Sequence, residues 1–231
     1  YRYYTEKVKK NNSISSVKKY DIISKESFIN CTLNNEKIKL CKKKNRNGNP
    51  IYEYYQFGDV GKIYGYQWNS FNGSYINQLD NIIDTLKTNP NDRRMLCIAF
   101  NPAQLDEMAL PPCHVMFQVY TRPLTEEEKN RNGSKEYAIS LLWTQRSVDT
   151  FLGLPFNIAS YAILLSMIAQ CVDMVPDKLI CSLGDTHLYT NHMDAVNKQL
   201  SRDTDMFKSP ILKLNPLKKN LLSFTSDENS F

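Results

Sequence analysis

One stretch, QRSVDTFLGLPFNIASY at residues 145–161, constrains the fold of this chain more than any other. It follows an apolar, strand-like run at residues 138–143 and leads into an apolar, helix-periodic segment that begins near Pro155. Its first half places Gln145, Arg146, Ser147 and Asp149 together at the end of the expected strand. A dense polar cluster therefore lies between a predicted strand and a predicted helix.

Two side chains in this stretch suit particular ligand groups. The guanidinium of Arg146 offers two parallel N–H donors, which match two oxygens of a phosphate or a carboxylate. Asn157, just inside the expected helix, carries both a donor and an acceptor, as reading the amide edge of a pyrimidine requires. A purely structural interpretation also stays open: an asparagine N-cap, a surface pair of Arg146 with Asp149, and a glycine turn.

Two further motifs flank the stretch. The first is MALPPCH at residues 108–114, and the second is GDTHLY at residues 184–189, which Asn191 and His192 follow closely. A cysteine is a nucleophile only as its thiolate, and the two prolines before Cys113 present its loop rigidly. A buried structural cysteine beside a capping histidine is nevertheless the commoner outcome for a generic Cys–His pair. Neither motif decides the function alone.

Together these motifs resemble one family, thymidylate synthase. Its hallmarks are a Pro-Cys-His nucleophile loop, a Gln-Arg-Ser phosphate strand, a Leu-Gly-x-Pro-Phe-Asn-Ile-Ala turn and a Gly-Asp-x-His-x-Tyr strand. All four occur here in the same order, over about residues 58–202. The resemblance is specific, because four separate motifs must coincide. It weakens toward both ends of the sequence.

The resemblance implies a set of site residues. Cys113 would add to C6 of the uracil ring of dUMP, Asn157 would bind the pyrimidine amide edge, and Asp149 would contact the pterin of the cofactor, 5,10-methylenetetrahydrofolate. The implied catalytic residues are Cys113, Arg146, Asn157 and Asp149. The implied dUMP-binding residues are Arg93 and Arg94 from a second subunit, with Gln145, Arg146, Ser147, Asn157, His187 and Tyr189. The implied folate-binding residues are Asp149, Gly153, Leu110 and Tyr52. No metal is implied.

The product of the reaction is left open between two outcomes. The expected activity is reductive methylation of dUMP to dTMP, and the alternative is a dUMP hydroxymethylase, in which water captures the exocyclic methylene. Tyrosines at Tyr52, Tyr54 and Tyr55 replace tryptophans that usually line the folate site, which favours the alternative. The lack of the family's closing C-terminal tail also favours the hydroxymethylase. The family's N-terminal phosphate loop and its proton-relaying acid are likewise not found in this sequence. Asn157 favours uracil over cytosine. A non-catalytic nucleotide-binding relative is a third interpretation.

The order of strand and helix patterns predicts an α+β fold. We expect a single domain with a mixed or antiparallel sheet and a buried central helix at residues 158–172. Strands are expected at residues 95–100, 115–121, 138–143 and 179–183. Helices are expected at residues 74–88, with Ser74 as N-cap, and at residues 191–200. Residues 124–136 are expected to form an exposed hairpin or loop. Residues 1–50 are expected to be a divergent Lys/Asn-rich segment, and residues 51–231 the catalytic domain.

Composition bounds the class of protein and its partners. The chain has 231 residues, 42% hydrophobic and 23% charged, which is ordinary for a globular protein. The net charge of +5 is modest, and the basic N-terminal segment lacks interleaved aromatics, so no nucleic acid is expected. Six cysteines without a C-x-x-C pair predict a reducing, cytoplasmic location. No membrane-spanning segment is expected. The family resemblance implies a homodimer that shares arginines across its interface.

Overall fold

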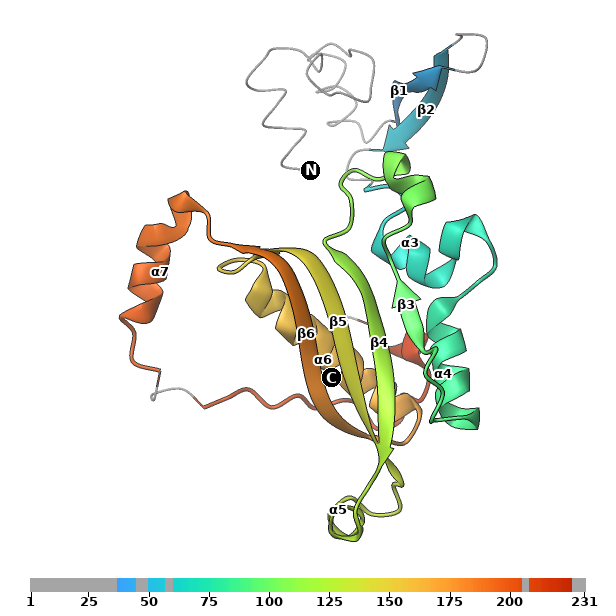
Figure 1. Cartoon of the computed structure of the whole chain (residues 1–231), viewed down its shortest axis with the longest axis vertical. Helices are drawn as coiled ribbons and strands as arrows, with labels where there is room; N and C mark the ends of the chain where they lie inside the picture. Colours follow the sequence, from blue (N-terminus) through green and yellow to red (C-terminus); the bar gives the residue numbers. More distant parts are fainter. Residues whose placement is uncertain (1–36, 45–49, 57–59, 205–207, 226–231) are drawn as a thin grey trace. The chain divides into compact units, whose positions relative to one another are not determined.

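The computed structural model describes residues 37–44, 50–56, 60–204 and 208–225 (Figure 1). They fall into two compact units. The first comprises Tyr1–Ile63 and Pro102–Pro111, and the second comprises Tyr64–Asn101 and Pro112–Phe231. The expected boundary between residues 50 and 51 falls beside undescribed residues and stays a prediction.

The first unit contains an antiparallel pair of strands, β1 (Lys37–Lys44) and β2 (Pro50–Gln56), with an irregularity between Cys41 and Lys43. It also contains a short 3-10 helix, η3 (Pro102–Glu107). Gly61 bridges to Met108, and a Cβ on Gly61 would lie 2.1 Å from the carbonyl oxygen of Glu107. Because its φ is also positive, at 75°, this position requires glycine.

The second unit is built on a four-stranded mixed sheet with the order β3-β4-β5-β6. These strands are β3 (Leu96–Ile98), β4 (His114–Pro123), β5 (Tyr137–Asp149) and β6 (Val175–His187). The first three run antiparallel, whereas β5 and β6 run parallel and are joined by helix α6 (Leu154–Cys171). This architecture confirms the predicted α+β class with a mixed sheet. Strand β5 is longer than expected and carries Gln145 to Asp149 within it.

Helix α6 lies against one face of the sheet (Figure 1). It buries Tyr161, Leu165, Ile168 and Ala169 in a core shared with the strands. The helix expected at residues 158–172 begins earlier, at Leu154, and its first turns are exposed, with Ile158 at 44%. The helix is apolar around its circumference, so periodicity alone does not identify the face that packs.

The 18 residues of α6, with a mean hydropathy of 1.4, are long and apolar enough to cross a membrane by length and composition. That finding differs from the expectation that no such segment exists. Core helices of globular proteins pass the same test, and α6 contributes its buried face to the core of the second unit.

Helix α4 (Gln78–Thr88) starts later than expected, and a helix forms within residues 124–136, where a hairpin or loop was expected. The start of α4 differs because Asn77, and not Ser74, accepts hydrogen bonds from the first free N–H groups. Residues 124–136 contain helix α5 (Glu126–Asn132), which a capping box of Thr125 and Glu128 starts. The other helical segments are α3 (Tyr64–Asn69), η2 (Phe71–Gly73), η4 (Thr190–His192), α7 (Met193–Leu200) and η5 (Leu221–Ser223).

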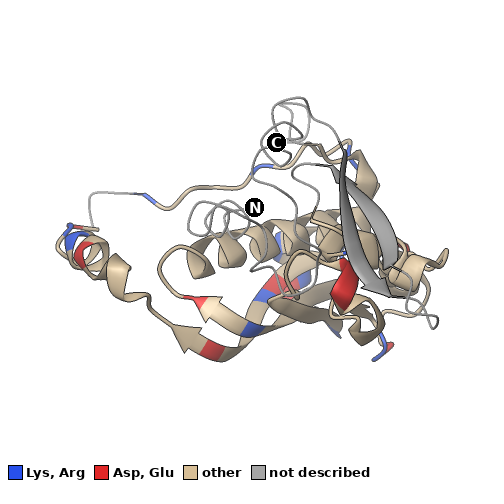
Figure 2. Ribbon diagram, turned by 90° about the horizontal axis from the view of Figure 1, so that it is seen from above, with Lys and Arg blue, Asp and Glu red and all other residues tan. Residues whose placement is uncertain are grey.

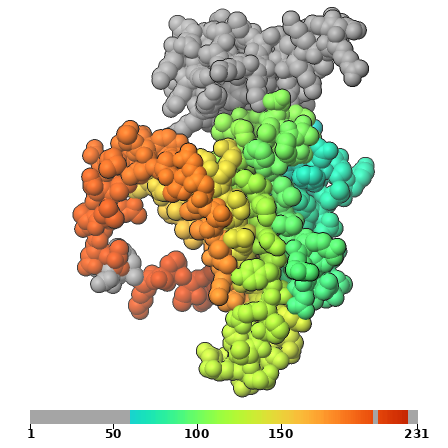
Figure 3. All heavy atoms as spheres, viewed as in Figure 1, coloured from blue at the N-terminus to red at the C-terminus, as the bar shows by residue number. Residues whose placement is uncertain are grey.

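Figure 2 colours the ribbon by residue type and shows basic and acidic positions interspersed along the described elements. Figure 3 shows the side chains of β4, β5 and β6 forming a continuous surface on the face of the sheet opposite α6. Tyr120 and Ile180 on this face are 40% and 38% exposed. Among the described residues no helix covers this face (Figure 1).

Arg122 joins three elements at the base of the sheet. Its guanidinium donates two hydrogen bonds to Glu128 on α5, at 2.9 and 2.8 Å, and one to Asp177 on β6, at 3.0 Å. The hydrogen bonds from Arg122, assisted by the Thr125 backbone, lower the pKa of Glu128 from 4.5 to about 2. A lowered carboxyl pKa stabilises the fold above the ordinary pKa, and this contribution is lost as the pH falls toward the folded value.

Arg122→Gln is therefore expected to lower the urea midpoint of unfolding near neutral pH. The difference from wild type should shrink as the pH falls from about 4.5 toward about 2, because protonated Glu128 no longer benefits from Arg122. Urea titrations at several pH values measure this difference. A difference that stays constant over this range would contradict the role given to the ion pair.

Candidate active site

Cys113 lies directly before β4, in a loop that is held from two sides. Its backbone N–H donates to the Tyr64 hydroxyl at 2.9 Å, and the N–H of His114 donates to the same oxygen at 3.4 Å. On the other side, the N–H of Arg146 donates to the Cys113 carbonyl at 2.9 Å. Cys113 is partly exposed. The loop thus fixes the backbone of Cys113, and the residue stays partly exposed.

The Arg146 side chain is tied to the same loop. Its Nε donates to the carbonyl oxygen of Pro112 at 2.9 Å, and the residue as a whole is exposed. The bond from Nε helps to fix the guanidinium plane beside the loop, and a guanidinium is the side chain whose planar set of N–H donors matches an oxyanion. The positive charge also acts on Tyr64, whose pKa is raised mainly by burial and is lowered in part by Arg146.

Asn157, in the first turn of α6, lines a cavity of about 350 Å³. Its carboxamide oxygen accepts a hydrogen bond from Gln145 at 3.1 Å, so β5 and α6 are linked at this point. The cavity is lined by Tyr64, Trp68, His114, Asn157, Ser160, Tyr161 and Leu164. Most of these side chains are flat or apolar, with a few polar groups among them, which is typical of a small-molecule site.

His114 forms one wall of this cavity. Its ring stacks on Tyr161 with centroids 5.4 Å apart, and its Nδ1 lies 3.1 Å from the Tyr161 hydroxyl. Burial lowers the pKa of His114, and a hydrogen bond to Asn157 acts in the opposite direction. Burial also raises the pKa of Tyr161. Both rings are consequently neutral at neutral pH, and the cavity wall carries hydrogen-bonding groups without charge.

The turn between β5 and α6 presents Asp149. One carboxylate oxygen accepts from the N–H groups of Phe151 and Leu152, both at 3.1 Å, and the Asp149 carbonyl accepts from the Gly153 N–H at 3.0 Å. A Cβ on Gly153 would lie 2.9 Å from that carbonyl and 3.7 Å from the Asn157 Oδ1. The turn therefore closes tightly and brings Gly153 beside Asn157.

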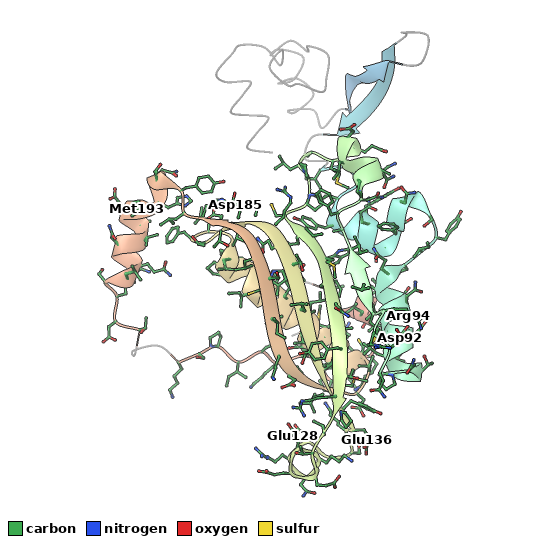
Figure 4. The ribbon with its side chains drawn as sticks, in the orientation of Figure 1. Asp92, Arg94, Glu128, Glu136, Asp185 and Met193 are labelled. Carbon is green, nitrogen blue, oxygen red and sulfur yellow. The ribbon has the colours of Figure 1, made fainter. Side chains whose placement is uncertain are left out.

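The end of β6 lies next to this turn. His187 pairs with Asp149 in the parallel register, and its carbonyl accepts from the N–H of Thr150 at 3.0 Å. The rings of His187 and Tyr189 meet edge to face with centroids 5.0 Å apart. Ser147 pairs with Asp185, which marks this end of the sheet in Figure 4. The sheet register thus places His187 and Tyr189 at the same edge as Asp149.

The arginine pair lies at the other end of the sheet from Asp185 (Figure 4). Arg94 forms an ion pair with Asp92 at 2.8 Å, and its side chain is 87% exposed. Hydrogen bonds from Arg94 lower the pKa of Asp92 to about 2. Arg93 is also exposed. Within one chain, Arg93 and Arg94 are therefore not brought together with Cys113.

Two of the residues expected at the folate site lie in the first unit. Leu110 is 52% exposed there, and Tyr52 lies in β2, where side chains are not described. Their relation to Cys113 is left as a prediction.

Sequence reasoning missed several residues of the site. Tyr64, which holds the Cys113 loop, belongs to none of the four motifs. Tyr161 and Trp143 were assigned to a helix and a strand, yet their rings stack on each other with centroids 4.9 Å apart. Motif spacing contains no signal for these contacts, because they join elements that are distant in the sequence.

Comparison with protein families identifies the group to which these motifs belong. The sequence model of the family described as thymidylate synthase matches residues 19–230. The chain belongs to the thymidylate synthase family. The match extends well beyond the region of about 58–202 that the motifs covered, and it spans both compact units. Members of this family are folate-dependent enzymes of pyrimidine nucleotide biosynthesis that act on dUMP.

Proposed function

We propose that this protein is a thymidylate synthase, which converts dUMP to dTMP with 5,10-methylenetetrahydrofolate. One observation carries the proposal: a partly exposed cysteine, a guanidinium tied to its loop and a carboxamide lining the adjacent cavity lie on neighbouring elements. These three groups match the three parts of the reaction centre, namely nucleophile, phosphate anchor and reader of the base. Ser147, His187 and Tyr189 extend the proposed nucleotide site along the same edge of the sheet.

In this proposal Cys113 adds through its sulfur to C6 of the uracil ring. The electron pair of the C5–C6 double bond then moves toward the ring carbonyl and makes C5 nucleophilic. Tyr64 and Arg146 hold the backbone on each side of the sulfur, so the nucleophile approaches in a fixed direction. Asn157 stabilises the negative charge that develops at the carbonyl, because its dipole is already oriented before the reaction.

Arg146 and Ser147 bind the phosphate in this scheme, and His187 and Tyr189 bind the deoxyribose hydroxyl. His114 is neutral because burial lowers its pKa, so it offers hydrogen bonds to the ring without adding charge. The cavity wall made by Tyr161 and Leu164 excludes water from one side of the ring.

The turn after β5 fits the cofactor. A pterin is a flat ring with several N–H donors, and the Asp149 carboxylate supplies acceptors while two backbone N–H groups hold it in place. Leu152 and Phe156, which are 47% and 72% exposed, provide apolar surface beside it. Gly153 lets the turn close, because a Cβ there would lie 2.9 Å from the Asp149 carbonyl oxygen. When bound, the folate supplies the one-carbon unit and the hydride that reduces it. Leu110 and Tyr52 are proposed to complete this site.

A dUMP hydroxymethylase is the second candidate. It is favoured by the tyrosines at Tyr52, Tyr54 and Tyr55, which stand where tryptophans usually line the folate site and so weaken the barrier to water. We place methyl transfer first, because it is the commoner outcome on this scaffold. Mass spectrometry of the nucleotide product separates the two. Thymidylate with dihydrofolate supports our choice, whereas 5-hydroxymethyl-dUMP with tetrahydrofolate supports the alternative.

We also propose an isologous homodimer in which Arg93 and Arg94 bind the phosphate in the partner's site. Two observations support it. Both arginines are exposed at the end of the sheet away from Asp185, and the sheet face opposite α6 is uncovered by any described helix. Four described cysteines, Cys97, Cys113, Cys171 and Cys181, are free, which supports a cytoplasmic location.

Mixing two inactive variants tests the shared site. Cys113→Ser and the double variant Arg93→Gln/Arg94→Gln should each be inactive alone. After mixing and subunit exchange, activity should return to about a quarter of wild type, because half of the dimers are hybrids and each hybrid has one intact site. Steady-state assays measure the recovery. If mixing restores nothing although exchange is shown by mass, the arginines do not act across the interface.

A further inference from the structure

We propose that Trp143 is a positioning residue that sets base specificity. Its indole N–H, acting through Gln145, fixes the orientation of the Asn157 carboxamide and so favours a uracil ring over a cytosine ring. The inference deepens the proposed function and rests on it. Its evidence is a chain of hydrogen bonds that leads from the core to the cavity.

The chain begins at a donor whose direction is unambiguous. Trp143 is 1% exposed and stacks on Tyr161, with centroids 4.9 Å apart and planes 12° apart, so its ring is held in place. Its Nε1 lies 3.3 Å from the Gln145 Oε1. An indole nitrogen only donates hydrogen bonds. The Gln145 atom that faces it must therefore be the oxygen.

The other end of Gln145 confirms this orientation. Its Nε2 donates to the carbonyl oxygen of Ser147 at 3.0 Å, and a backbone carbonyl only accepts. Gln145 is itself 3% exposed, so water does not replace either partner. A reversed carboxamide would set N–H against N–H at Trp143 and oxygen against oxygen at Ser147. Trp143 and Ser147 together hold Gln145 in one orientation.

The orientation of Gln145 determines that of the Asn157 carboxamide. The same Nε2 donates to the Asn157 Oδ1 at 3.1 Å. The oxygen of Asn157 therefore faces Gln145, and Nδ2 lies on the other side of the planar carboxamide, in a side chain that lines the cavity together with His114. Oδ1 has two lone pairs, and His114, which also hydrogen-bonds the Asn157 side chain, competes with a pyrimidine N–H for the second.

This orientation matches one pyrimidine better than the other. At positions 4 and 3 uracil offers a carbonyl acceptor and an N–H donor, whereas cytosine offers an amino donor and a ring-nitrogen acceptor. A fixed Nδ2 donor with an adjacent acceptor lone pair complements uracil. Cytosine would require Asn157 to reverse its amide, which would place two donors face to face at Gln145.

A role of Trp143 in core packing alone predicts different results. If Trp143 only fills the core, loss of its indole N–H leaves the preference between dUMP and dCMP unchanged. Any core substitution that lowers stability by a similar amount then has the same effect on that preference. Trp143→Phe keeps an aromatic ring and removes the donor. Phe117→Leu is a matched core control, because Phe117 is fully buried and also contacts Tyr161, with centroids 6.2 Å apart.

Gln145→Glu tests the relay, the chain of hydrogen bonds from Trp143 through Gln145 to Asn157, by reversing the carboxamide of Asn157. A carboxylate still accepts from Trp143, but it has no donor for Asn157. Asn157 is then expected to turn its Nδ2 toward the carboxylate and its oxygen toward the ligand. Preference should move toward dCMP in this variant, although residue 157 is unchanged.

The experiment is calorimetric titration of the full-length protein and each variant with dUMP and with dCMP, with thermal unfolding as a check on folding. In Trp143→Phe the ratio of Kd for dCMP to Kd for dUMP should fall roughly tenfold, the scale of one hydrogen bond. In Gln145→Glu the ratio should fall further or invert. Phe117→Leu should keep the wild-type ratio even if its melting temperature falls.

The outcomes separate the inference from the proposed function. If Trp143→Phe folds and keeps the wild-type ratio of Kd for dCMP to Kd for dUMP, the inference is wrong and the proposed function stands. The same holds if Phe117→Leu changes this ratio as much as Trp143→Phe does. Wild-type protein that binds neither nucleotide overturns the proposed function and the specificity claim with it. Hydrogen exchange of the Trp143 indole N–H, measured by NMR without nucleotide, should be faster in Gln145→Leu. Unchanged exchange contradicts the first link of the relay.

Discussion

Cys113→Ser is expected to reduce turnover at least about a thousandfold, which corresponds to roughly 4 kcal/mol of transition-state stabilisation. A hydroxyl is a much weaker nucleophile than a thiolate at neutral pH. Binding of dUMP should be largely retained, because the groups proposed to hold it are Arg146 and Asn157, and the loop is fixed through its backbone. Steady-state kinetics and equilibrium binding of dUMP measure the two effects separately.

Cys181→Ser is the matched control, since Cys181 is an exposed, free cysteine on β6. It should keep wild-type activity. A Cys113→Ser protein that retained about a tenth of the wild-type rate would show that another residue is the nucleophile.

Asn157→Asp is expected to shift substrate preference from dUMP toward dCMP. A carboxyl group reverses the hydrogen-bond polarity that the side chain offers to the ring edge. The ratio of kcat/KM for dUMP to that for dCMP should fall about a hundredfold or more, roughly 2.7 kcal/mol. Competition assays with both nucleotides measure this ratio directly.

Asn197→Asp provides the control for the added charge, because Asn197 lies exposed on α7. Its discrimination should equal that of wild type. Unchanged discrimination in Asn157→Asp would remove Asn157 from base recognition and would also undercut the relay from Trp143.

The sequence predicted the parts of the fold that local patterns determine. The nearly continuous apolar run before Gln145 identifies β5, and Pro155 marks the first turn of α6. The start of α4 was misplaced because Ser74 and Asn77 are both good N-caps, and only the structure shows which side chain meets the free N–H groups. Helix α5 was missed although Thr125 and Glu128 have the spacing of a capping box.

The candidate site was only partly accessible to sequence reasoning. Its motif residues could be predicted because reactive or ligand-binding residue types occur in them at a recognisable spacing. The contacts that orient them were not, because Tyr64 meets the Cys113 loop across 49 residues of sequence. The stacking of Trp143 on Tyr161 likewise depends on how α6 packs on β5. Such pairings follow from the tertiary arrangement, and no local pattern encodes them.

Covalent capture tests the central claim most directly. The full-length protein is incubated with 5-fluoro-dUMP and 5,10-methylenetetrahydrofolate, digested, and its peptides are analysed by mass spectrometry. Fluorine at C5 blocks the loss of the proton that normally releases the nucleotide, so a thymidylate synthase accumulates an adduct. We expect the combined mass of nucleotide and folate on the peptide that contains Cys113, and none in Cys113→Ser. No adduct in wild-type protein, or an adduct on another cysteine, would contradict the proposed mechanism.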